Sequence, residues 1–338
     1  MIRRLWLGPL LLISQIPLVT SAHAQKSLPA VRVGIAGISG SNAHPYVSDQ
    51  LGLFAKNGIG MEQVVFQGGT QLVQAMVAGE LPLGLIDGTP IFAADMRGAN
   101  IVFIGGVINT LPYTIVSQSD IRAPNDLRGK RIGISRYGSS SDIAVRLTLE
   151  RKNLKPDKEV AILQIGGQSE RFAALKAGVV QATIVSPPFN LVARRLGFND
   201  LIDISDTGIA YPHIQVAAAR EFIDRHPDQV VRFLKGLFEG MSYWKDPAKK
   251  DPVTRTLAKF LKLDPEKERD QLDETFRYYG KVFPSRPYAS LEGLEYSVAL
   301  LKKTRPEAKN LQAKDYVVNR FVDELEKEGF LARLTGMR

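Results

Sequence analysis

The sequence contains no cysteine at any of its 338 positions. Disulfide bonds, thiol catalysis and a lipid carried on a cysteine are therefore excluded. Histidine is also rare, with four in the whole chain and no H-E-x-x-H pair. Because catalytic zinc sites draw mainly on histidine, cysteine and carboxylate ligands, we expect neither a metal nor another cofactor.

The motifs of nucleotide-binding proteins and serine hydrolases are missing too. No G-x-x-x-x-G-K-[ST] occurs, and the glycines of GIAGISG are spaced by three, which does not fit G-x-G-x-x-G. G-x-S-x-G is absent because Ser41 stands where the closing glycine would be. A phosphate-binding loop and a hydrolase nucleophile therefore lose their usual sequence support.

The one long apolar run is at the start of the chain. Arg3 and Arg4 precede LWLGPLLLISQIPLVT, which is followed by the small-x-small site Ala22-His23-Ala24. Glycine, proline and polar residues interrupt the run, which is shorter than the roughly 20 apolar residues of a membrane span. We predict a signal peptide over residues 1–24 and a soluble, periplasmic mature protein that is not a lipoprotein.

The formal net charge is +9, and it becomes +7 without residues 1–24. The basic residues are dispersed and form no stripe with interleaved aromatics, so we expect no nucleic-acid partner. The length favours two lobes. From Val31 onward short β-branched runs alternate with amphipathic stretches, which predicts α/β lobes with mostly parallel sheets flanked by helices.

The predicted boundaries place residues 27–110 and 214–338 in lobe I. Residues 111–213 form an inserted lobe II, joined to lobe I by two hinge segments. After a last strand at 213–219 the chain is predicted to be helical. Apolar residues from Val230 to Trp244 recur on one helix face, which indicates packing against lobe I. Further helices are predicted over 251–262, 265–279, 289–303 and 314–335.

Five loops rich in small polar residues each follow a predicted strand: 37–44, 67–71, 87–90, 136–142 and 186–189. In open α/β sheets, ligands bind at the carboxyl ends of strands, where helix N-termini and small residues allow close hydrogen bonding. Taken singly, each loop is better explained as a turn followed by a helix cap. The five loops together predict a ligand cleft.

Four stretches carry a resemblance to a known family: DQLGLFAKNGI (49–59), FQGGTQLVQAMVAGELPLGL (66–85), IRAPNDLRGKRIGI (121–134) followed by GSSSD, and RFAALKAGVVQATIVSPPF (171–189). The chain resembles periplasmic solute-binding proteins of ABC importers, in the branch with alkanesulfonate, taurine and nitrate binders and the NMT1/THI5-like group. The resemblance covers nearly the whole mature chain. Pro82 and Gln181 stand where the family usually has aspartate.

This resemblance implies a type II periplasmic-binding fold that closes on a small molecule and delivers it to a membrane permease with a separate ATPase subunit. It also implies a monomer without bond-making chemistry. Carried over by position, it implies a ligand pocket with Gln168, at the start of its own helix, as a further candidate. The other residues that it places in the pocket are Ser39, Ser41, Asn42, His44, Gly68, Gly69, Thr70, Asp87, Thr89, Tyr137, Ser139, Ser140, Ser141, Pro187 and Phe189. Serines, backbone N–H groups and Arg136 favour a sulfonate or carboxylate, whereas Asp87 and Asp142 favour a cationic or zwitterionic ligand.

Three alternatives remain open at this point. One is an exported enzyme in which a serine at 139–141 acts with His44 or His213 as base. Another is a sensor or tripartite-carrier module on the same fold. The third is a relative of the pyrimidine-precursor synthases, which resemble the chain less well because their enzymatic members carry a cysteine-rich motif. Within RIGISRYGSSSD (131–142), we assign Asp142 to the helix cap and Tyr137–Ser140 to the ligand.

Overall fold

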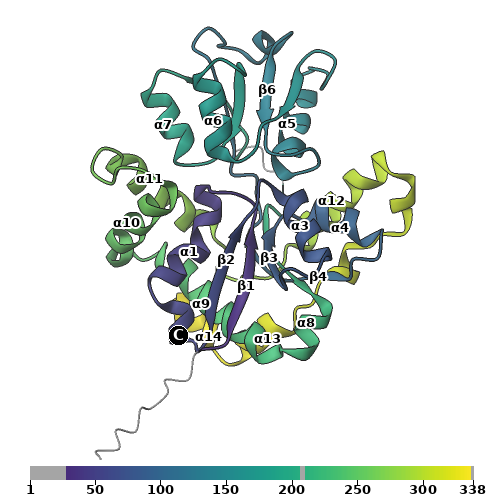
Figure 1. The fold of residues 1–338 in the computed structure, drawn as a ribbon, viewed down its shortest axis with the longest axis vertical. Helices are drawn as coiled ribbons and strands as arrows, with labels where there is room; N and C mark the ends of the chain where they lie inside the picture. Colours follow the sequence, from purple (N-terminus) through teal and green to yellow (C-terminus); the bar gives the residue numbers. More distant parts are fainter. Residues whose placement is uncertain (1–27, 206–209, 336–338) are drawn as a thin grey trace, which may run out of the picture.

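The computed structural model describes residues 28–205 and 210–335 and contains two five-stranded sheets. The predicted signal peptide, residues 1–24, lies outside the described residues. Figure 1 shows the sheets one above the other, each with helices on its faces. The predicted two-lobed α/β fold is confirmed. We call the sheet β2-β1-β3-β10-β4 with its helices the first lobe, and the sheet β7-β6-β8-β5-β9 with its helices the second lobe.

The first sheet combines parallel and antiparallel pairs. β1 runs parallel to β2 and β3, whereas β10 runs antiparallel to β3 and β4. All eight residues of β4 are buried, as its continuous apolar run predicts for a strand covered on both faces. The strands are β1 Ala30–Ile35, β2 Gly60–Val65, β3 Leu83–Ile86, β4 Ile101–Ile108 and β10 Ile214–Ala219.

The second sheet repeats this plan. β6 runs parallel to β7 and β8, and β5 runs antiparallel to β8 and β9. Parallel neighbours bring their carboxyl ends to one edge, so the loops after β6, β7 and β8 gather there, as do the loops after β1, β2 and β3 in the first lobe. The strands are β5 Thr114–Ser117, β6 Arg131–Ile134, β7 Ala161–Gln164, β8 Ala182–Val185 and β9 Asn199–Asp203.

The helices follow the strands in chain order. Those between the strands are α1 Ala43–Gln50, α2 Leu53–Lys56, α3 Gly69–Val77, α4 Gly88–Asp95, α5 Ser140–Arg151, α6 Gln168–Lys176 and α7 Phe189–Arg195. After β10 come α8 Arg220–Arg225, α9 Pro227–Tyr243, α10 Lys250–Leu261, α11 Arg269–Val282, α12 Leu291–Thr304, α13 Arg320–Lys327 and α14 Phe330–Thr335. Short 3-10 turns lie at Gly40–Asn42, Pro124–Leu127, Pro247–Lys249, Pro306–Asn310 and Ala313–Tyr316.

The apolar face of α9 packs on the first lobe, which confirms its predicted role. Phe233 stacks on Phe54 of α2, with ring centroids 5.3 Å apart. The predicted continuous helix over 314–335 is wrong. Val318 donates its backbone N–H to the carbonyl of Phe103 in β4, and Gly329 has a φ of +69° that ends α13. The chain therefore forms a 3-10 turn and two short helices there.

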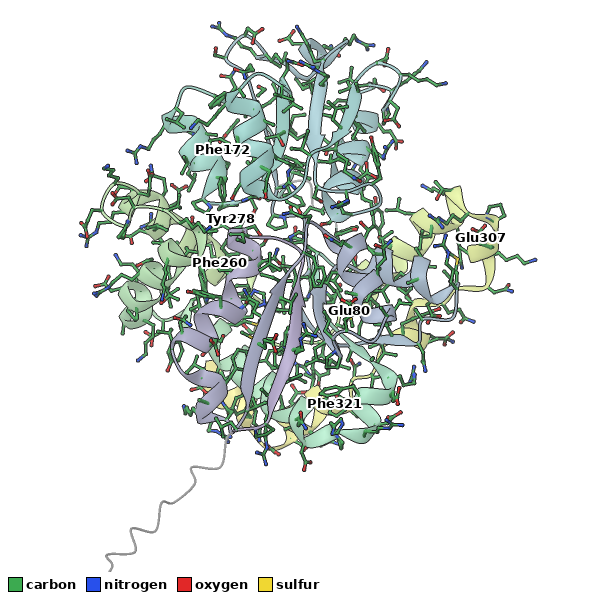
Figure 2. All side chains as sticks on the ribbon, in the orientation of Figure 1. Glu80, Phe172, Phe260, Tyr278, Glu307 and Phe321 are labelled. Atoms are coloured by element: carbon green, nitrogen blue, oxygen red, sulfur yellow. The ribbon has the colours of Figure 1, made fainter. Side chains whose placement is uncertain are left out.

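The two lobes contact each other across the space between them. Gln67 of the first lobe accepts a hydrogen bond from the backbone N–H of Gly167 of the second, at 2.6 Å. Arg195 on α7 donates to the carbonyl of Lys267, at 2.6 Å. Gly40 lies so close to the carbonyl oxygen of Pro187 that a Cβ at this position would overlap it. The lobes are therefore closed against each other. In Figure 2 the side chains fill both lobes and meet between them.

The strands of the first sheet come from residues 30–108 and 214–219, and those of the second from residues 114–203. The boundaries given above for the two lobes stay a prediction. No helix in the described part of the chain is long and apolar enough to span a membrane.

Candidate functional site

A small enclosed cavity of about 30 Å³ lies where the two sets of strand ends meet. Its walls come from the loops after β1, β2 and β3 in the first lobe and from the β6–α5 loop and α6 in the second lobe. The crossing segments between the lobes contribute Tyr113 and His213. The lining residues are Ala36, Gly37, Ile38, Ser39, Ser41, Asn42, Gly68, Gly69, Leu85, Ile86, Asp87, Tyr113, Ser135, Ser139, Ser140, Gln168, Arg171, His213 and Ile214.

The first-lobe loop after β1 is held by its own polar side chains. The hydroxyls of Ser39 and Ser41 share a hydrogen bond of 3.0 Å. The side-chain amide of Asn42 donates to the carbonyl of Gly37 at 2.9 Å. Three residues predicted to bind the ligand thus line the cavity while also fixing the loop that presents them.

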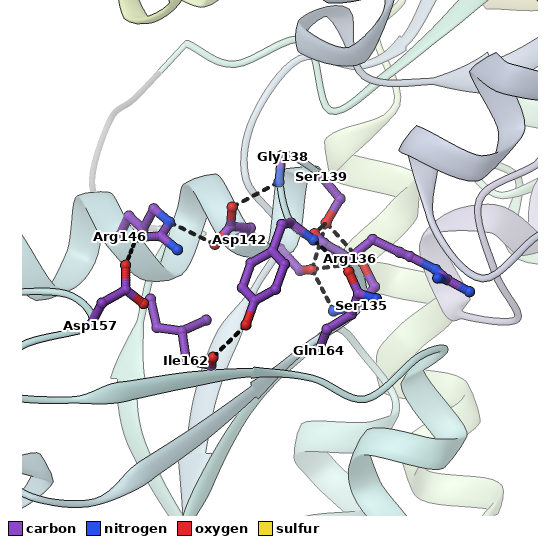
Figure 3. Close-up of polar contacts among 11 residues, drawn as sticks. Ser135, Arg136, Gly138, Ser139, Asp142, Arg146, Asp157, Ile162 and Gln164 are labelled. Carbon is purple, nitrogen blue, oxygen red and sulfur yellow. Dashed lines mark hydrogen bonds and ion pairs between the residues drawn. The ribbon is translucent and has the colours of Figure 1, made fainter. Parts of the chain in front are cut away.

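The second-lobe loop after β6 contains a cluster of bonded serines, shown in Figure 3. Ser135, Ser139 and Ser141 share hydroxyl hydrogen bonds of 2.8–3.0 Å. Ser141 also accepts a hydrogen bond from the backbone N–H of Ser135, at 2.9 Å. Ser140 points elsewhere: its hydroxyl lies 3.2 Å from that of Tyr113 and lines the cavity. The cluster therefore stabilises the loop, and Ser140 is the serine best placed to contact a ligand.

The remainder of this loop faces away from the cavity. Asp142 accepts hydrogen bonds from the backbone N–H of Gly138, at 2.8 Å, and from Arg146, at 2.7 Å, as expected for a group at the start of a helix. Helix α5 begins at Ser140 with Ser139 as its N-cap. Tyr137 is half exposed and donates its hydroxyl to the carbonyl of Ile162, outside the cavity.

Asp87 is a buried carboxyl group at the end of β3. The hydroxyl of Tyr211, in the second crossing segment, donates to it at 3.3 Å. Burial raises the pKa of Asp87 to about 7, because a charged carboxylate loses its hydration. Hydrogen bonds from Tyr211 and from the backbone N–H groups of Thr89 and Ser140 counteract part of this rise in pKa. Asp87 of the first lobe thus faces the start of α5 in the second.

Arg171 on α6 is a buried cation that sequence reasoning missed. Its guanidinium donates to the carbonyls of Ile184 and Gly166 at 2.8–3.2 Å. It forms no ion pair within residues 28–205 and 210–335. Burial lowers its pKa to about 10, so it stays protonated near neutral pH. A buried charge normally requires a partner, and Arg171 has these carbonyl acceptors but no ion pair among the described residues.

His213, named in the sequence analysis only as a possible catalytic base, lines the cavity. Its ring packs edge-on against Tyr113 with centroids 4.9 Å apart, and it is 5% exposed. Neither ring nitrogen has a hydrogen-bond partner among the described residues. Burial lowers its pKa to about 3, so the ring is neutral near pH 7. In the sequence, the only sign of this location is that His213 lies at the end of a segment that crosses between the lobes.

Gln168 begins α6 as predicted and lines the cavity. Its side-chain oxygen accepts hydrogen bonds from the backbone N–H and the hydroxyl of Ser186, at 2.9 and 3.1 Å. Its amide donates to the carbonyl of Ser186 at 3.3 Å. Gln168 therefore joins the start of α6 to the loop after β8 and leaves one face toward the cavity.

The other predicted residues lie beside the cavity. His44 packs against Phe283, Phe189 packs against Phe172, and Pro187 contacts Gly40. Arg136 lies against Gly68, and its buried Nε has no partner among the described residues. Thr70 and Thr89 line a neighbouring groove together with Tyr137. Gly68, Gly69, Ser39, Ser41, Asn42, Asp87, Ser139, Ser140 and Gln168 are the predicted residues that meet in the cavity.

A serine nucleophile would need a histidine within hydrogen-bond distance, so the contacts of the serines and histidines near the cavity test the enzyme alternative. Within the described chain, the hydroxyls of Ser139, Ser140 and Ser141 bond to other serines, to Tyr113 or to backbone groups. The ring of His44 contacts the carbonyl of Ser41 through Nδ1, and that of His213 contacts no polar group. The described residues also contain no group of three or more histidines and carboxylates placed to hold a metal ion.

Comparisons with known proteins agree with this architecture. The sequence profile of the family described as NMT1/THI5 like matches residues 41–250. A Brucella abortus (strain 2308) protein named as a binding protein is 27% identical over 268 residues, which are 78% of this chain and 80% of that protein.

Two solved structures show the same fold. The alkanesulfonate-binding protein SsuA from Xanthomonas axonopodis pv. citri, bound to MOPS, matches with a TM-score of 0.70 and 20% identity, over 87% of this chain and 99% of that one. The periplasmic nitrate-binding protein NrtA from Synechocystis PCC 6803 matches with a TM-score of 0.71 and 15% identity, over 91% of this chain and 89% of that one.

Proposed function

Because the chain belongs to the NMT1/THI5-like family, we propose that it is the extracytoplasmic solute-binding component of an ABC importer. It captures a small organic anion, such as a sulfonate or carboxylate, in the cavity between the lobes. Closure of the lobes retains the ligand, and the closed protein delivers it to a membrane permease that works with a separate ATPase subunit. The fold shared with sulfonate- and nitrate-binding proteins supports a solute-binding role.

The observation that carries this proposal is the set of hydrogen-bonding groups at the cavity wall that lack partners. Both ring nitrogens of His213 are buried without a partner in the described structure, and each such group costs free energy. Arg171 adds a buried positive charge without an ion pair. An anion with hydrogen-bond acceptors satisfies a ring N–H and the buried charge together, and so stabilises the closed form.

Asp87 decides which anions fit and at what pH. When it is ionised, its charge repels an anion in the same small cavity. Because its pKa is about 7, it is largely protonated below neutral pH and then has a hydroxyl to donate. A purely anionic ligand is therefore favoured below pH 7. A zwitterion can pair its cationic group with ionised Asp87 above pH 7.

Closure supplies the contacts that make binding selective. Ser39, Ser41 and Asn42 come from the first lobe, whereas Ser140 and Arg171 come from the second. A ligand held by one lobe gains the other set only when the lobes approach, so it shifts the equilibrium toward the closed form. The crossing segments around Tyr113 and Tyr211 are the hinges of this motion.

A binding role without catalysis accounts for the serines better than an enzyme does. Ser139 and Ser141 are engaged in hydrogen bonds that hold their own loop. The two histidines that a serine nucleophile would need as base have pKa values lowered by burial to about 3. A base near neutral pH requires a much higher pKa. We therefore assign no catalytic residue.

Cellular location and domain organisation are part of the same proposal. Residues 1–24 direct export and are removed, which leaves a monomer in the periplasm. Residues 27–110 with 214–338 form one lobe, and residues 111–213 form the other. The neighbouring permease and ATPase genes would distinguish an importer component from a sensor or a tripartite carrier.

The test is a thermal-shift screen of the mature protein at pH 6 with four classes of compound: sulfonates, carboxylates, amines and pyrimidines. A ligand present at 100 times its Kd stabilises the folded state by about 2.7 kcal/mol, which raises the Tm by a few degrees. We expect sulfonates or carboxylates to raise the Tm and simple amines to leave it unchanged. A response to amines or pyrimidines alone would contradict the proposed ligand class.

A further inference from the structure

A contact between the lobes lies outside the cavity, where α7 of the second lobe meets α11 of the first (Figure 1). We call it the α7–α11 seam and define it by Gly40, Pro187, Arg195, Glu268 and Tyr279. None of these residues is among those that line the cavity. A change at the seam therefore leaves the walls of the ligand site as they are.

Gly40 has no room for a side chain while the lobes are together. It lies in the turn Gly40–Asn42 that follows β1, and a Cβ there would overlap the carbonyl oxygen of Pro187 in the second lobe. The same Cβ would lie 2.9 Å from the ring of Tyr279, whose hydroxyl donates to that carbonyl at 3.5 Å. A backbone carbonyl moves only with the chain around it, whereas a ring can rotate about its side-chain bonds. The lobes must therefore move apart to accommodate a Cβ at Gly40.

Gly106 is packed as tightly as Gly40, but against its own lobe. A Cβ at Gly106 on β4 would overlap the carbonyl oxygen of Tyr288, which belongs to the first lobe as Gly106 does. A motion between the lobes cannot relieve that overlap, whereas it relieves the overlap at Gly40. The φ of Gly40 lies outside the positive region, so a side chain there causes no backbone strain once the lobes are apart.

Arg195, at the end of α7, holds the outer side of the same seam. Its guanidinium donates to the carbonyl of Lys267 at 2.6 Å, and to the side-chain oxygens of Glu268 at 3.0 Å and Gln271 at 3.2 Å. All three acceptors belong to the first lobe. Hydrogen bonds from a charged donor are stronger than neutral ones, although the half-exposed position of Arg195 weakens them. Arg195 therefore stabilises the closed arrangement without touching the cavity.

We propose that the α7–α11 seam sets the affinity for the ligand from outside the cavity, with Gly40 and Arg195 as positioning residues. This inference rests on the proposed solute-binding function and names how the same site is regulated. A bound ligand is retained only in the closed form, so every contact that favours closure adds to the affinity. Gly40 permits the lobes to meet, and Arg195 stabilises them once they have met.

The first test needs no ligand. Gln67→Cys and Glu170→Cys place one thiol on each lobe, at side chains that bond to each other at 3.3 Å in the closed form. The chain contains no other cysteine, so a short bis-maleimide cross-links the pair at a rate that follows the population of the closed form. Adding Gly40→Ala should slow the cross-linking at least about tenfold. Adding Gly60→Ala, whose Cβ would make only an ordinary contact of 3.4 Å with Ala30, should leave the rate unchanged.

The second test measures binding of the sulfonate that raises the Tm most in the thermal-shift screen. Gly40→Ala should weaken the affinity about 100-fold through faster dissociation, with little change in the association rate, because the ligand still reaches the open first lobe. Arg195→Met should weaken the affinity about fivefold. Arg194→Met is the matched control and should bind like the wild type, because Arg194 pairs with Asp200 of its own lobe. Calorimetry measures the affinities and stopped-flow mixing measures the rates.

Thermal unfolding separates opening of the lobes from a folding defect. Gly40→Ala should unfold at nearly the Tm of the wild type, because each lobe keeps its own packing. Gly106→Ala, whose overlap lies within one lobe, should lower the Tm by several degrees. If Gly40→Ala lowers the Tm as much as Gly106→Ala does, opening of the lobes does not relieve the overlap, and the inference is wrong.

Two further results would overturn the inference while the solute-binding proposal stands. One is an unchanged cross-linking rate in Gly40→Ala. The other is a sulfonate that leaves Gly40→Ala as slowly as it leaves the wild type. If no compound of the screen binds to the wild type, the proposed ligand class fails instead, and the cross-linking rate still decides whether the seam controls closure.

Discussion

The polar cavity and the groove lined by residues of α3, α4, α5 and α12 differ in chemistry and in size. Among the described residues, the ring nitrogens of His213 in the cavity have no hydrogen-bond partner, and Arg171 has carbonyl acceptors but no ion pair. The groove is lined by apolar side chains and by Arg97, Lys303 and Arg305, which form no ion pair within the same residues. A polar cavity of about 30 Å³ can recognise a charged group and orient it, whereas a groove of about 710 Å³ is far larger than such a group.

This difference indicates where specificity arises. Buried polar groups without a partner discriminate strongly between ligands, because a ligand that cannot form a hydrogen bond with them leaves them unpaired. Apolar contacts discriminate weakly between similar bodies but add affinity with every buried CH₂ group. Each substitution below removes one polar group at the cavity and leaves the groove intact, so a change in binding assigns recognition to the cavity.

The largest effect is expected from Arg171→Met. The variant removes the buried charge and leaves the carbonyls of Gly166 and Ile184 without donors. The free energy of unfolding should fall by about 3 kcal/mol, and the affinity for a sulfonate should fall about 100-fold. Urea unfolding and calorimetry measure the two quantities. Arg151→Met, at an exposed position on the same lobe, is the control and should change neither the free energy of unfolding nor the affinity. If Arg171→Met binds the sulfonate as tightly as the wild type, Arg171 does not contribute to the ligand site.

The next effect concerns Asp87 and pH. Wild-type affinity for a sulfonate, which stays ionised, should increase about tenfold as the pH falls from 8.5 to 5.5, because protonation of Asp87 removes a repulsive charge. His213, with a pKa of about 3, does not titrate in this window. Asp87→Asn should bind equally across the window. A persistent pH dependence in this variant would assign the effect to another group.

Asp87 also has a defined effect on stability. Its pKa in the folded state is raised to about 7, above the usual 3.8. The folded state therefore keeps a proton that the unfolded state releases. The resulting stabilisation of the folded state is fully present below pH 3.8 and is lost as the pH rises to about 7. The free energy of unfolding of the wild type, relative to that of Asp87→Asn, should therefore fall as the pH rises from 4.5 to 8. Asp120→Asn, at an exposed position, should show no such shift.

A smaller effect is expected from His213→Phe. The phenyl ring keeps the packing against Tyr113 but removes two ring nitrogens that have no partner in the described structure. Stability should therefore not fall, while the affinity for a sulfonate falls about fivefold, the value of one neutral hydrogen bond. His226→Phe, which alters a ring that packs on Phe222 away from the cavity, is the control. Unchanged affinity in His213→Phe would show that the ring does not contact the ligand.

The smallest effects distinguish two neighbouring serines. Ser141→Ala removes the acceptor of the Ser135 backbone N–H and should lower the free energy of unfolding by about 1 kcal/mol. Ser140→Ala should change stability less and weaken sulfonate binding about threefold. Thermal unfolding and calorimetry of both variants separate the roles. The reverse pattern would mean that Ser141, not Ser140, faces the ligand.

Local sequence patterns predicted most of the fold. The alternation of short β-branched runs with amphipathic stretches predicted two α/β lobes but no strand at β9. The spacing from Val230 to Trp244 identified α9 and its buried face. The interruption of the helix predicted over 314–335 could not be foreseen, because Val318 pairs with Phe103, a residue more than 200 positions away. Periodicity reports local preference and contains no information on such distant pairing.

The site was predictable to the extent that it consists of loops at strand ends. Ser39, Asp87 and Ser140 lie in segments that follow strands, and small residues in such loops indicate a ligand site. Arg171 was missed because an arginine on an amphipathic helix is usually exposed, and only tertiary packing buries this one against Ile184. His213 was considered only as a possible catalytic base and not as a ligand-binding residue, because a lone histidine carries no signal of its partners. Tyr137, predicted to face the ligand, has its hydroxyl bonded to Ile162 instead.

The most direct test of the proposed ligand site is a crystal structure of the mature protein with the sulfonate that raises the Tm most in the thermal-shift screen. The sulfonate group is predicted to lie in the cavity, within hydrogen-bond distance of His213 and Ser140 and near the guanidinium of Arg171. A sulfonate bound outside the cavity, with His213 and Ser140 free of contact, would contradict the proposed site.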